Sequence, residues 1–325
     1  MHSEWRIAVL NGMITRGDGR DASFRRRQAF PRTGIIKYFN SLRNMPEIVS
    51  PSAPHRSSPV LRWSGIGLGA ATWVSAAFFG MYTLAFYFGA IPSGRMDKWN
   101  IFVPGLYDKR NLAALLAIGA HFATGAFILF LGPVQLIGGL RRRWPWVHRW
   151  IGRTYVFTAL VTGLGGLGFI ATKGTIGGAA MNIGFGLYGV LMVLAAVQTY
   201  RSARGRRWEQ HRAWAIRLFA LAIGSWLYRM DYGFWLALAA PAPIGHLANY
   251  RGPFDVVMSF LFYLPNLAVA ELFLRAAGML SQPVLRISTV IVLNGASLLL
   301  IVGTYNIVHD YWGAVIIRFL LGRAG

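Results

Sequence analysis

Long apolar stretches, separated by short polar or basic segments, follow one another along most of the chain. A helix needs about 20 apolar residues to cross a bilayer, because each residue adds about 1.5 Å and the hydrocarbon core is about 30 Å thick. Seven stretches reach or approach this length: 63–90, 112–140, 151–171, 176–200, 213–228 (which can continue to 240), 254–274 and 284–308. The pattern therefore predicts an all-α, polytopic transmembrane helix bundle of about seven spans.

The segments outside these stretches divide the chain into three parts. Residues 1–61 contain the arginine run Arg25–Arg27 and many Pro and Ser residues, and no apolar period is sustained there. This composition favours a disordered cytoplasmic arm, with an organelle transit peptide as the alternative. Residues 62–310 form the predicted transmembrane domain, with a core at 112–240. Residues 311–325 are too short to span and are predicted to form an interfacial segment.

Charged residues are few and mostly basic. The chain contains 33 Lys and Arg against 11 Asp and Glu, a net charge of +22, yet only 14% of its residues are charged. Soluble domains average about 25%. The arginines gather in the arm and in the loops 141–153 and 201–212. Two spans separate these loops, so they share one side, and their positive charge places them and the N-terminus inside. This predicts a multi-pass protein of the plasma membrane, such as the bacterial inner membrane, and explains the charge without nucleic acid.

Two segments show the same order of residues at a constant spacing. Val134-Gln135 closes one apolar stretch and Val197-Gln198 another, with an offset of 197 − 134 = 63. An arginine cluster follows each, and then come His148-Arg149 and His211-Arg212, with an offset of 211 − 148 = 63. This repeat predicts a core of two related helical hairpins that turn on the same side of the membrane.

Three histidines are candidate cofactor ligands. The chain has no cysteine, which excludes disulfides, thiol catalysis and Cys-ligated metals. His121 lies inside the second apolar stretch, whereas His148 and His211 lie at matching entrances of two helices. Imidazoles from two helices are the usual axial ligands of b-type haem in a bundle. The three histidines are therefore predicted haem b ligands or proton carriers. The alternative is that His121 is satisfied within the bundle and that His148 and His211 contact lipid headgroups.

Other polar side chains in or near the spans are candidates for binding a substrate or a lipid headgroup, because a polar group in lipid is costly without a partner. Arg229 lies near the end of the fifth stretch, where an anionic substrate group, Glu271 or Asp255 could pair with it. Arg217 is expected to reach the inner surface. The sequence contains no nucleophile-elbow, phosphate-loop or HExxH motif. The candidates of this kind are Gln135, Arg149, Arg153, Arg212, Arg217 and Arg229.

Between about residues 115 and 230, these polar groups occur in a distinctive order. The order is His121, Gly132-Pro133 with Gln135, His148-Arg149, Gly152-Arg153 and Tyr155, a Gly-rich helix pair, His211-Arg212 with Trp214 and Arg217, and a final Arg229. It resembles the family of predicted bacterial membrane proteins called domain of unknown function 2306. The resemblance implies a four-helix membrane core without an assigned reaction. The arm, the first helix and the last two helices lie outside it.

Two classes of function follow. The first is a redox or electron-transfer membrane protein that uses b-type haem or a quinone, with His121, His148 and His211 as ligands or proton carriers. The second is a non-redox transporter, or a protein that binds anionic lipid headgroups or a small solute through Arg217, Arg229 and the two His-Arg pairs. A scaffold without a ligand is a third reading. The lipid bilayer is the expected partner in every case.

Overall fold

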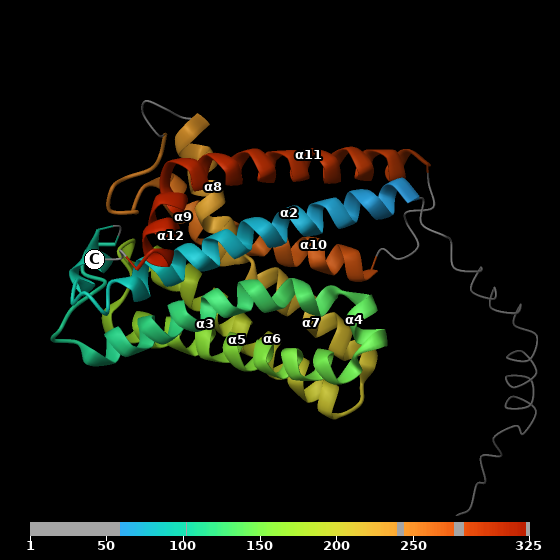
Figure 1. Ribbon diagram of the computed structural model, residues 1–325, viewed down its shortest axis with the longest axis horizontal. Coiled ribbons are helices and arrows are strands. Elements are labelled where there is room, and N and C mark those ends of the chain that lie inside the picture. The colour runs from blue at the N-terminus through green and yellow to red at the C-terminus, as the bar shows by residue number, and fades with distance from the viewer. Residues whose placement is uncertain (1–58, 102, 239–243, 276–282, 323–325) are drawn as a thin grey trace, which may run out of the picture. The chain divides into compact units, whose positions relative to one another are not determined.

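The structure is a computed structural model, and it describes residues 59–101, 103–238, 244–275 and 283–322. Every regular element within these ranges is a helix (Figure 1), which confirms the predicted all-α bundle. The predicted arm lies outside the described residues except for its last three positions, because the first described helix already begins at Pro59.

The helices follow one another in chain order with short connections. They are α2 (Pro59–Thr83), the π-helix η1 (Leu84–Phe88), the 3-10 helix η2 (Met96–Asn100), α3 (Leu112–Leu136), α4 (Gly138–Arg143), α5 (Pro145–Lys173), α6 (Gly178–Arg204), α7 (Trp208–Ala222), α8 (Gly224–Leu238), α9 (Pro253–Leu261), α10 (Leu264–Arg275), α11 (Pro283–Ile307), the π-helix η4 (Val308–Trp312) and α12 (Gly313–Leu320).

Six helical segments are long and apolar enough to cross a membrane, and they correspond to six of the seven predicted stretches. They are Pro59–Phe88, Leu112–Leu136, Pro145–Lys173, Gly178–Arg204, Pro253–Glu271 and Arg286–Leu320. The remaining predicted span corresponds to α7 and α8. Each of these helices has 15 residues, and the helix is interrupted between them at Ile223.

Helices α7 and α8 together run along α6 in the opposite direction. His211, near the start of α7, bonds to a carbonyl near the end of α6. Leu221, near the end of α7, accepts a hydrogen bond from Tyr188 in the middle of α6. After α8, the side chain of Arg251 lies beside Gly178 at the start of α6. The two short helices thus cross the bundle as one broken span, and the six apolar segments plus this one give seven crossings.

The basic segments are more helical than the sequence pattern suggested. The predicted loop 141–153 contains the end of α4 and the first turns of α5, which begins at Pro145. Proline is favoured in the first turn because the N–H that it lacks would have no intrahelical partner there. The predicted start at Ile151 was therefore six residues too late (151 − 145). We call the end of the bundle that carries these arginines the inner end.

The sequence repeat appears as two hairpins whose second helices start at equivalent positions. Trp144 and Arg207 are the N-caps of α5 and α7, and 207 − 144 = 63. His148 and His211 are each the fourth residue of their helix. The hairpins differ where they turn, because α3 contains Pro133 and ends at Leu136, whereas α6 continues to a position that corresponds to 141.

Four of the crossings close into a ring. Helix α3 packs on α5, α5 on α6, α6 on α7, and α7 on α3. Around this ring, α2 packs on α3 and α11, while α9 and α10 pack on α6 and α7 (Figure 1). The ring is the four-helix core that the resemblance implied, and it contains most of the predicted site residues.

The contact between α3 and α5 depends on glycine. A Cβ atom at Gly165 of α5 would lie 2.6 Å from the carbonyl oxygen of Ala117 on α3. By contrast, a Cβ at Gly186 of α6 would meet nothing within 4 Å. Small residues of this kind let membrane helices approach closely. This close approach places His121 of α3 directly against α5.

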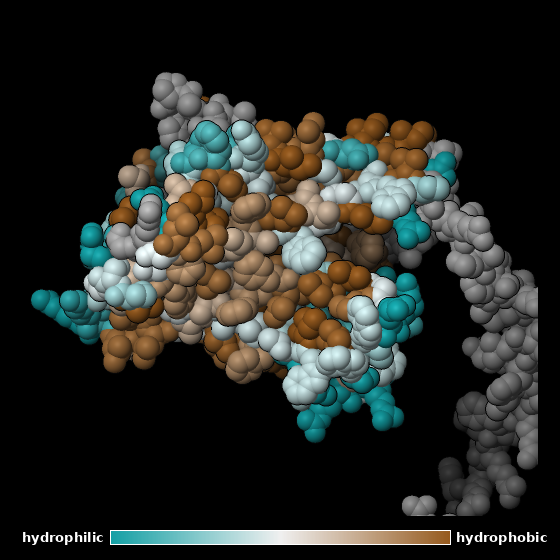
Figure 2. Space-filling model, in the orientation of Figure 1, coloured by the Kyte–Doolittle hydropathy of each residue, from teal (hydrophilic) through white to brown (hydrophobic). Residues whose placement is uncertain are grey.

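The surface of the bundle suits a lipid environment. Figure 2 shows hydrophobic side chains over most of the middle of the visible face and hydrophilic side chains mainly towards its two ends. Large apolar side chains such as Leu116, Phe157 and Ile183 are each 65% exposed. Lipid tails cover such surface, and the helical form satisfies the backbone inside the membrane.

We expect the connection 244–252 to lie on the outer face. The chain has no cysteine, so a single cysteine in place of the exposed Asn249 gives a unique label site. A membrane-impermeant maleimide added to intact cells should label Asn249→Cys. The same reagent should label Gly205→Cys, at the inner end, only after permeabilisation. Protection of Asn249→Cys in intact cells would mean that α7 and α8 enter and leave on one side.

Candidate functional site

The two repeat-related histidines lie at the inner end, but only one of them has a partner there. Nδ1 of His211 lies 3.0 Å from the carbonyl oxygen of Thr199 on α6. A carbonyl only accepts hydrogen bonds, so in the neutral ring Nδ1 carries the proton and Nε2 carries the lone pair. Nδ1 of His148 is buried without a hydrogen-bond partner. The two rings interact electrostatically, so they lie in one region of the bundle.

Two more polar groups close to His148 lack partners. They are Nε2 of Gln135 and the hydroxyl of Tyr155, and both atoms are buried. His148, Gly152 and Tyr155 follow one another at spacings of four and three residues, so they share one face of α5. A Cβ at Gly152 would lie 3.1 Å from Oε1 of Gln135, so this face packs against the end of α3. We call Gln135, His148, Tyr155 and His211 the inner seam.

The unpaired atoms of the inner seam are energetically unfavourable. A buried polar atom without a hydrogen bond costs about 1–3 kcal/mol, and native proteins retain few of them. Within the described part of the chain, the side chains with such atoms are Gln135, His148 and Tyr155. The sequence reading did not select Tyr155 as a binding residue, although its spacing of seven residues from His148 placed both on one helix face.

Three predicted arginines lie on the surface of the inner end. Arg149, Arg153 and Arg212 are all exposed. The guanidinium of Arg153 lies 5.4 Å from the ring centroid of Trp150. Arginines beside tryptophan at a membrane boundary are suited to contact lipid headgroups, and their exposure separates them from the buried inner seam.

Arg217 has a carboxylate partner. It forms an ion pair with Glu271 of α10, and its guanidinium lies 4.8 Å from the ring centroid of Trp214. The expectation that Arg217 extends to the inner surface is therefore wrong. The pair links α7 to α10, and Glu271 is not the partner of Arg229.

His121 is fixed between α3 and α5. Its Nδ1 lies 2.8 Å from the carbonyl oxygen of Thr162, so the neutral ring carries its proton on Nδ1 and a lone pair on Nε2. The hydroxyl of Thr124 lies 2.8 Å from that of Thr162. A Cβ at Gly166 would lie 3.1 Å from Nδ1 of His121, so this glycine gives the ring its room.

Helix α8 directs Arg229 toward the bundle interior. On one side of the helix, Trp226 donates a hydrogen bond to Ser75 of α2, over 3.0 Å. On another side, Tyr228 packs on Phe185 of α6, with ring centroids 5.3 Å apart. At about 100° per residue, Arg229 falls between these two directions. Its side chain therefore points into the space between α2 and α6.

The guanidinium of Arg229 has aromatic neighbours but no acidic partner. Nη1 donates to the carbonyl of Ser225, 2.9 Å away on the same helix. The ring centroids of Phe79 and Tyr228 lie 5.1 Å and 5.7 Å from its Cζ. Within the described ranges, no carboxylate lies within ion-pair distance of Arg229. The residue is nevertheless exposed, so its charge is accessible to a ligand.

Arg229 and His121 lie at a similar depth near the middle of the membrane. His121 is nine residues from the outer end of α3 (121 − 112), and Phe79 is nine residues from the outer end of η1 (88 − 79). Nine residues correspond to about 14 Å, or nearly half of a hydrocarbon core of about 30 Å. The charge of Arg229 also acts on His121. We call Phe79, His121, Tyr228 and Arg229 the central site.

Asp255, the other expected partner of Arg229, is used elsewhere. It is fully buried at the start of α9. Its Oδ1 lies 2.7 Å from Nδ1 of His246 and 2.7 Å from the hydroxyl of Tyr232. The sequence reading assigned His246 to a loop and did not consider Tyr232, because nothing in their spacing indicated that they meet.

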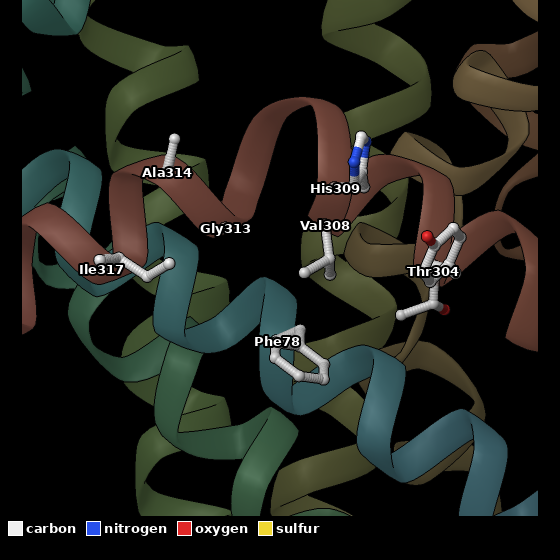
Figure 3. Close-up of a pocket in the computed structure, with 8 residues that line it drawn as sticks. Phe78, Thr304, Val308, His309, Gly313, Ala314 and Ile317 are labelled. Atoms are coloured by element: carbon white, nitrogen blue, oxygen red, sulfur yellow. The ribbon is translucent and has the colours of Figure 1, made fainter.

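A groove of about 590 Å³ lies at the surface, between α2 and the last helices. It is lined mainly by apolar groups, among them Phe78, Val308 and Ile317 (Figure 3). His309 stands at its edge, is exposed, and bonds to the neighbouring Asp310. The groove contains no residue of the inner seam or the central site, and its composition suits a lipid tail.

These features define a polytopic helical membrane protein with polar groups at two depths of its core. Residues 118–274 match the model of the family described as predicted membrane protein (DUF2306), so the chain carries the domain of this family. The match confirms the resemblance and extends it through α9 and nearly all of α10, which the sequence reading had left outside. It contains the inner seam and all of the central site except Phe79. Neither curated proteins nor solved structures gave a match.

The different surroundings of Arg217 and Arg229 predict opposite effects on stability. Arg217→Met should lower the stability of the detergent-purified protein by about 1–3 kcal/mol, because Glu271 loses its partner. This is less than for a fully buried pair, since the two side chains are 24% and 32% exposed. Arg229→Met should leave the thermal midpoint unchanged or raise it, because it removes a charge without a counter-ion. A loss as large as that of Arg217→Met would identify Arg229 as a structural residue.

Proposed function

We propose that the protein binds an anionic molecule with an apolar body at the central site, and that this binding serves transport. The observation that supports the proposal is Arg229, an accessible guanidinium near mid-depth without a carboxylate partner. Transporters bind their substrates near the bilayer midplane, at helices that are interrupted there. The broken span α7–α8 carries Arg229 in its second half.

The chemistry of Arg229 favours a carboxylate or a phosphate. A guanidinium has five N–H donors in a planar fork, and it binds such anions through two parallel hydrogen bonds. The structure uses Nη1 for the carbonyl of Ser225. A bound anion would complete the donors and neutralise a charge that is costly in the membrane.

The walls of the site favour an apolar body on the ligand. Phe79 and Tyr228 both place a ring beside the guanidinium. Stacking on these rings would add to the ion pair. His121 is neutral in its bonded form and accepts through Nε2, so it suits a hydroxyl group on the ligand rather than a second negative charge.

Binding of small anions tests this proposal. We expect titration calorimetry of the detergent-purified protein to detect benzoate or octanoate, which have an apolar body, in preference to inorganic phosphate. Arg229→Gln should weaken binding at least about tenfold, because a charge-assisted hydrogen bond contributes about 1.5–3 kcal/mol. Arg149→Gln, which removes an exposed arginine at the inner end, is the matched control and should bind as the wild type does.

The same experiment separates a free solute from a lipid. In nanodiscs of neutral lipid, added anionic lipid should not displace benzoate if the ligand is a solute. Displacement by anionic lipid that depends on Arg229 would instead identify a headgroup as the ligand. If none of the three anions binds, or if Arg229→Gln binds them as well as the wild type, the proposal is wrong.

The inner seam supports a second candidate function, a quinone- or haem-linked redox protein. His211 bonds through Nδ1 to a backbone carbonyl, as histidine ligands of metals commonly do, and this leaves Nε2 available. Gln135 and Tyr155 can both donate to a quinone oxygen, and His148 can exchange a proton with it. His121 lies 14 residues before Gln135 on α3, or about 21 Å along the helix. It therefore cannot bind the same group.

A quinone fits the inner seam more readily than a haem does. The unpaired atoms of Gln135, His148 and Tyr155 are buried in packed surroundings. A porphyrin would have to separate α3, α5 and α7 around them. A quinone oxygen would need only a movement of the side chains. If haem were bound, His148 and His211 would be its ligands, and the haem would supply one-electron chemistry at the inner end.

The second candidate predicts a redox-active group in the purified protein. Protein made with ample haem should show either a reduced-minus-oxidised absorbance band or a quinone in its solvent extract. His148→Ala should lose the band or the quinone, and Tyr155→Phe should lower the quinone content alone. Arg149→Gln should change neither. A flat spectrum together with a quinone-free extract would leave the central site as the functional site.

A further inference from the structure

A chain of hydrogen-bonded side chains connects the outer connection 244–252 with the central site. Asp255 is its middle member and accepts four hydrogen bonds. Two come from the backbone, from Leu247 at 3.0 Å and Gly252 at 2.9 Å, and they hold the connection onto α9. The other two come from the side chains of His246 and Tyr232, both at 2.7 Å. The two side-chain partners are more than a helix cap needs.

The chain extends inward along α8. The side chains of Tyr232 and Tyr228 are hydrogen-bonded, with ring centroids 4.7 Å apart. Tyr228 is a member of the central site, since its ring lies beside Arg229. At the other end, the His246 side chain is 16% exposed. The members His246, Asp255, Tyr232 and Tyr228 therefore run from the outer surface to the middle of the membrane, and we call them the outer relay.

We propose that the outer relay carries a proton between the outer surface and the central site, so that binding of the anion is coupled to proton uptake. This inference rests on the function proposed for the central site. It goes beyond that function by naming proton coupling and the residues that provide it.

Each transfer conserves the protons of the relay. His246 takes a proton from the outer solution and passes one to the carboxylate of Asp255. Asp255 gives a proton to the hydroxyl oxygen of Tyr232 as Tyr232 gives its own to Tyr228. Tyr228 in turn releases its hydroxyl proton to the anion bound at Arg229. Every hydroxyl ends with one proton, and the net change is one proton moved inward.

Few other charged groups face the relay. From the outer connection, Tyr250 packs on His246, with ring centroids 5.2 Å apart. Burial raises the pKa of Tyr250, so its hydroxyl stays neutral and does not compete for the proton. From α8, the charge of Arg229 acts on Tyr228. From α9, Asp255 is itself a relay member. Arg251 lies further off, beside Gly178 at the start of α6.

A purely structural role of Asp255 would also explain its hydrogen bonds, so the variants must preserve the fold. His246→Gln keeps an N–H donor for Asp255 but cannot bind a proton. Tyr232→Phe keeps the ring and leaves Asp255 three hydrogen bonds. Tyr250→Phe is the matched control, because Tyr250 touches His246 and Tyr232 but is not a member of the relay.

The experiment counts protons during anion binding. Benzoate, or octanoate if it binds better, is titrated into the purified protein by calorimetry in buffers of different ionisation enthalpy, at pH values where the anion is fully ionised. We expect about one proton taken up per anion in the wild type and in Tyr250→Phe. The affinity should then fall up to about tenfold for each pH unit of increase. His246→Gln and Tyr232→Phe should bind the anion with little proton uptake and a flat pH dependence.

The outcomes separate the two proposals. If the wild type binds the anion without proton uptake, the relay is wrong and the central site stands. Unchanged uptake in both His246→Gln and Tyr232→Phe would equally overturn the relay. If the wild type binds no anion, both proposals fail together.

Discussion

The structure depends on one constraint, which is that a polar group among membrane helices must find its partner inside the protein. Most of the described polar groups meet it. His121 and His211 bond to backbone carbonyls, and Arg217 pairs with Glu271. The inner seam and the guanidinium of Arg229 do not meet it fully. Because these exceptions gather at two depths of one core, they mark the places where this fold gives up stability for binding.

The architecture could be predicted from the sequence because its signals are summed over many residues. An apolar stretch of 20 residues and a cluster of arginines remain visible whatever their neighbours are. Helix ends depend on single residues and were predicted less well. The start of α5 was missed because basic residues hide a helix that Pro145 can begin. The break at Ile223 has no clear signal in the chain, since Gly224 resembles the many other glycines of these helices.

The candidate site was predictable only in part. His121 and Arg229 could be selected because an ionisable residue within an apolar stretch is conspicuous. Their partners could not, because packing decides them. Glu271 and Asp255 were both candidates to pair with Arg229, and the fold gives neither to it. Tyrosines such as Tyr155 resemble ordinary membrane aromatics in sequence, and only the groups around the hydroxyl distinguish them.

The break between α7 and α8 also has a mechanical consequence. A single residue, Ile223, separates the two helices, and the carbonyl of Leu221 beside it is held by the hydroxyl of Tyr188 at 2.8 Å. A change of angle at this joint would swing the outer segment as one rigid arm, carrying Arg229 with it, while His211 stayed with α7. The inner half of the span would then act as the base of a lever, and the joint as its pivot.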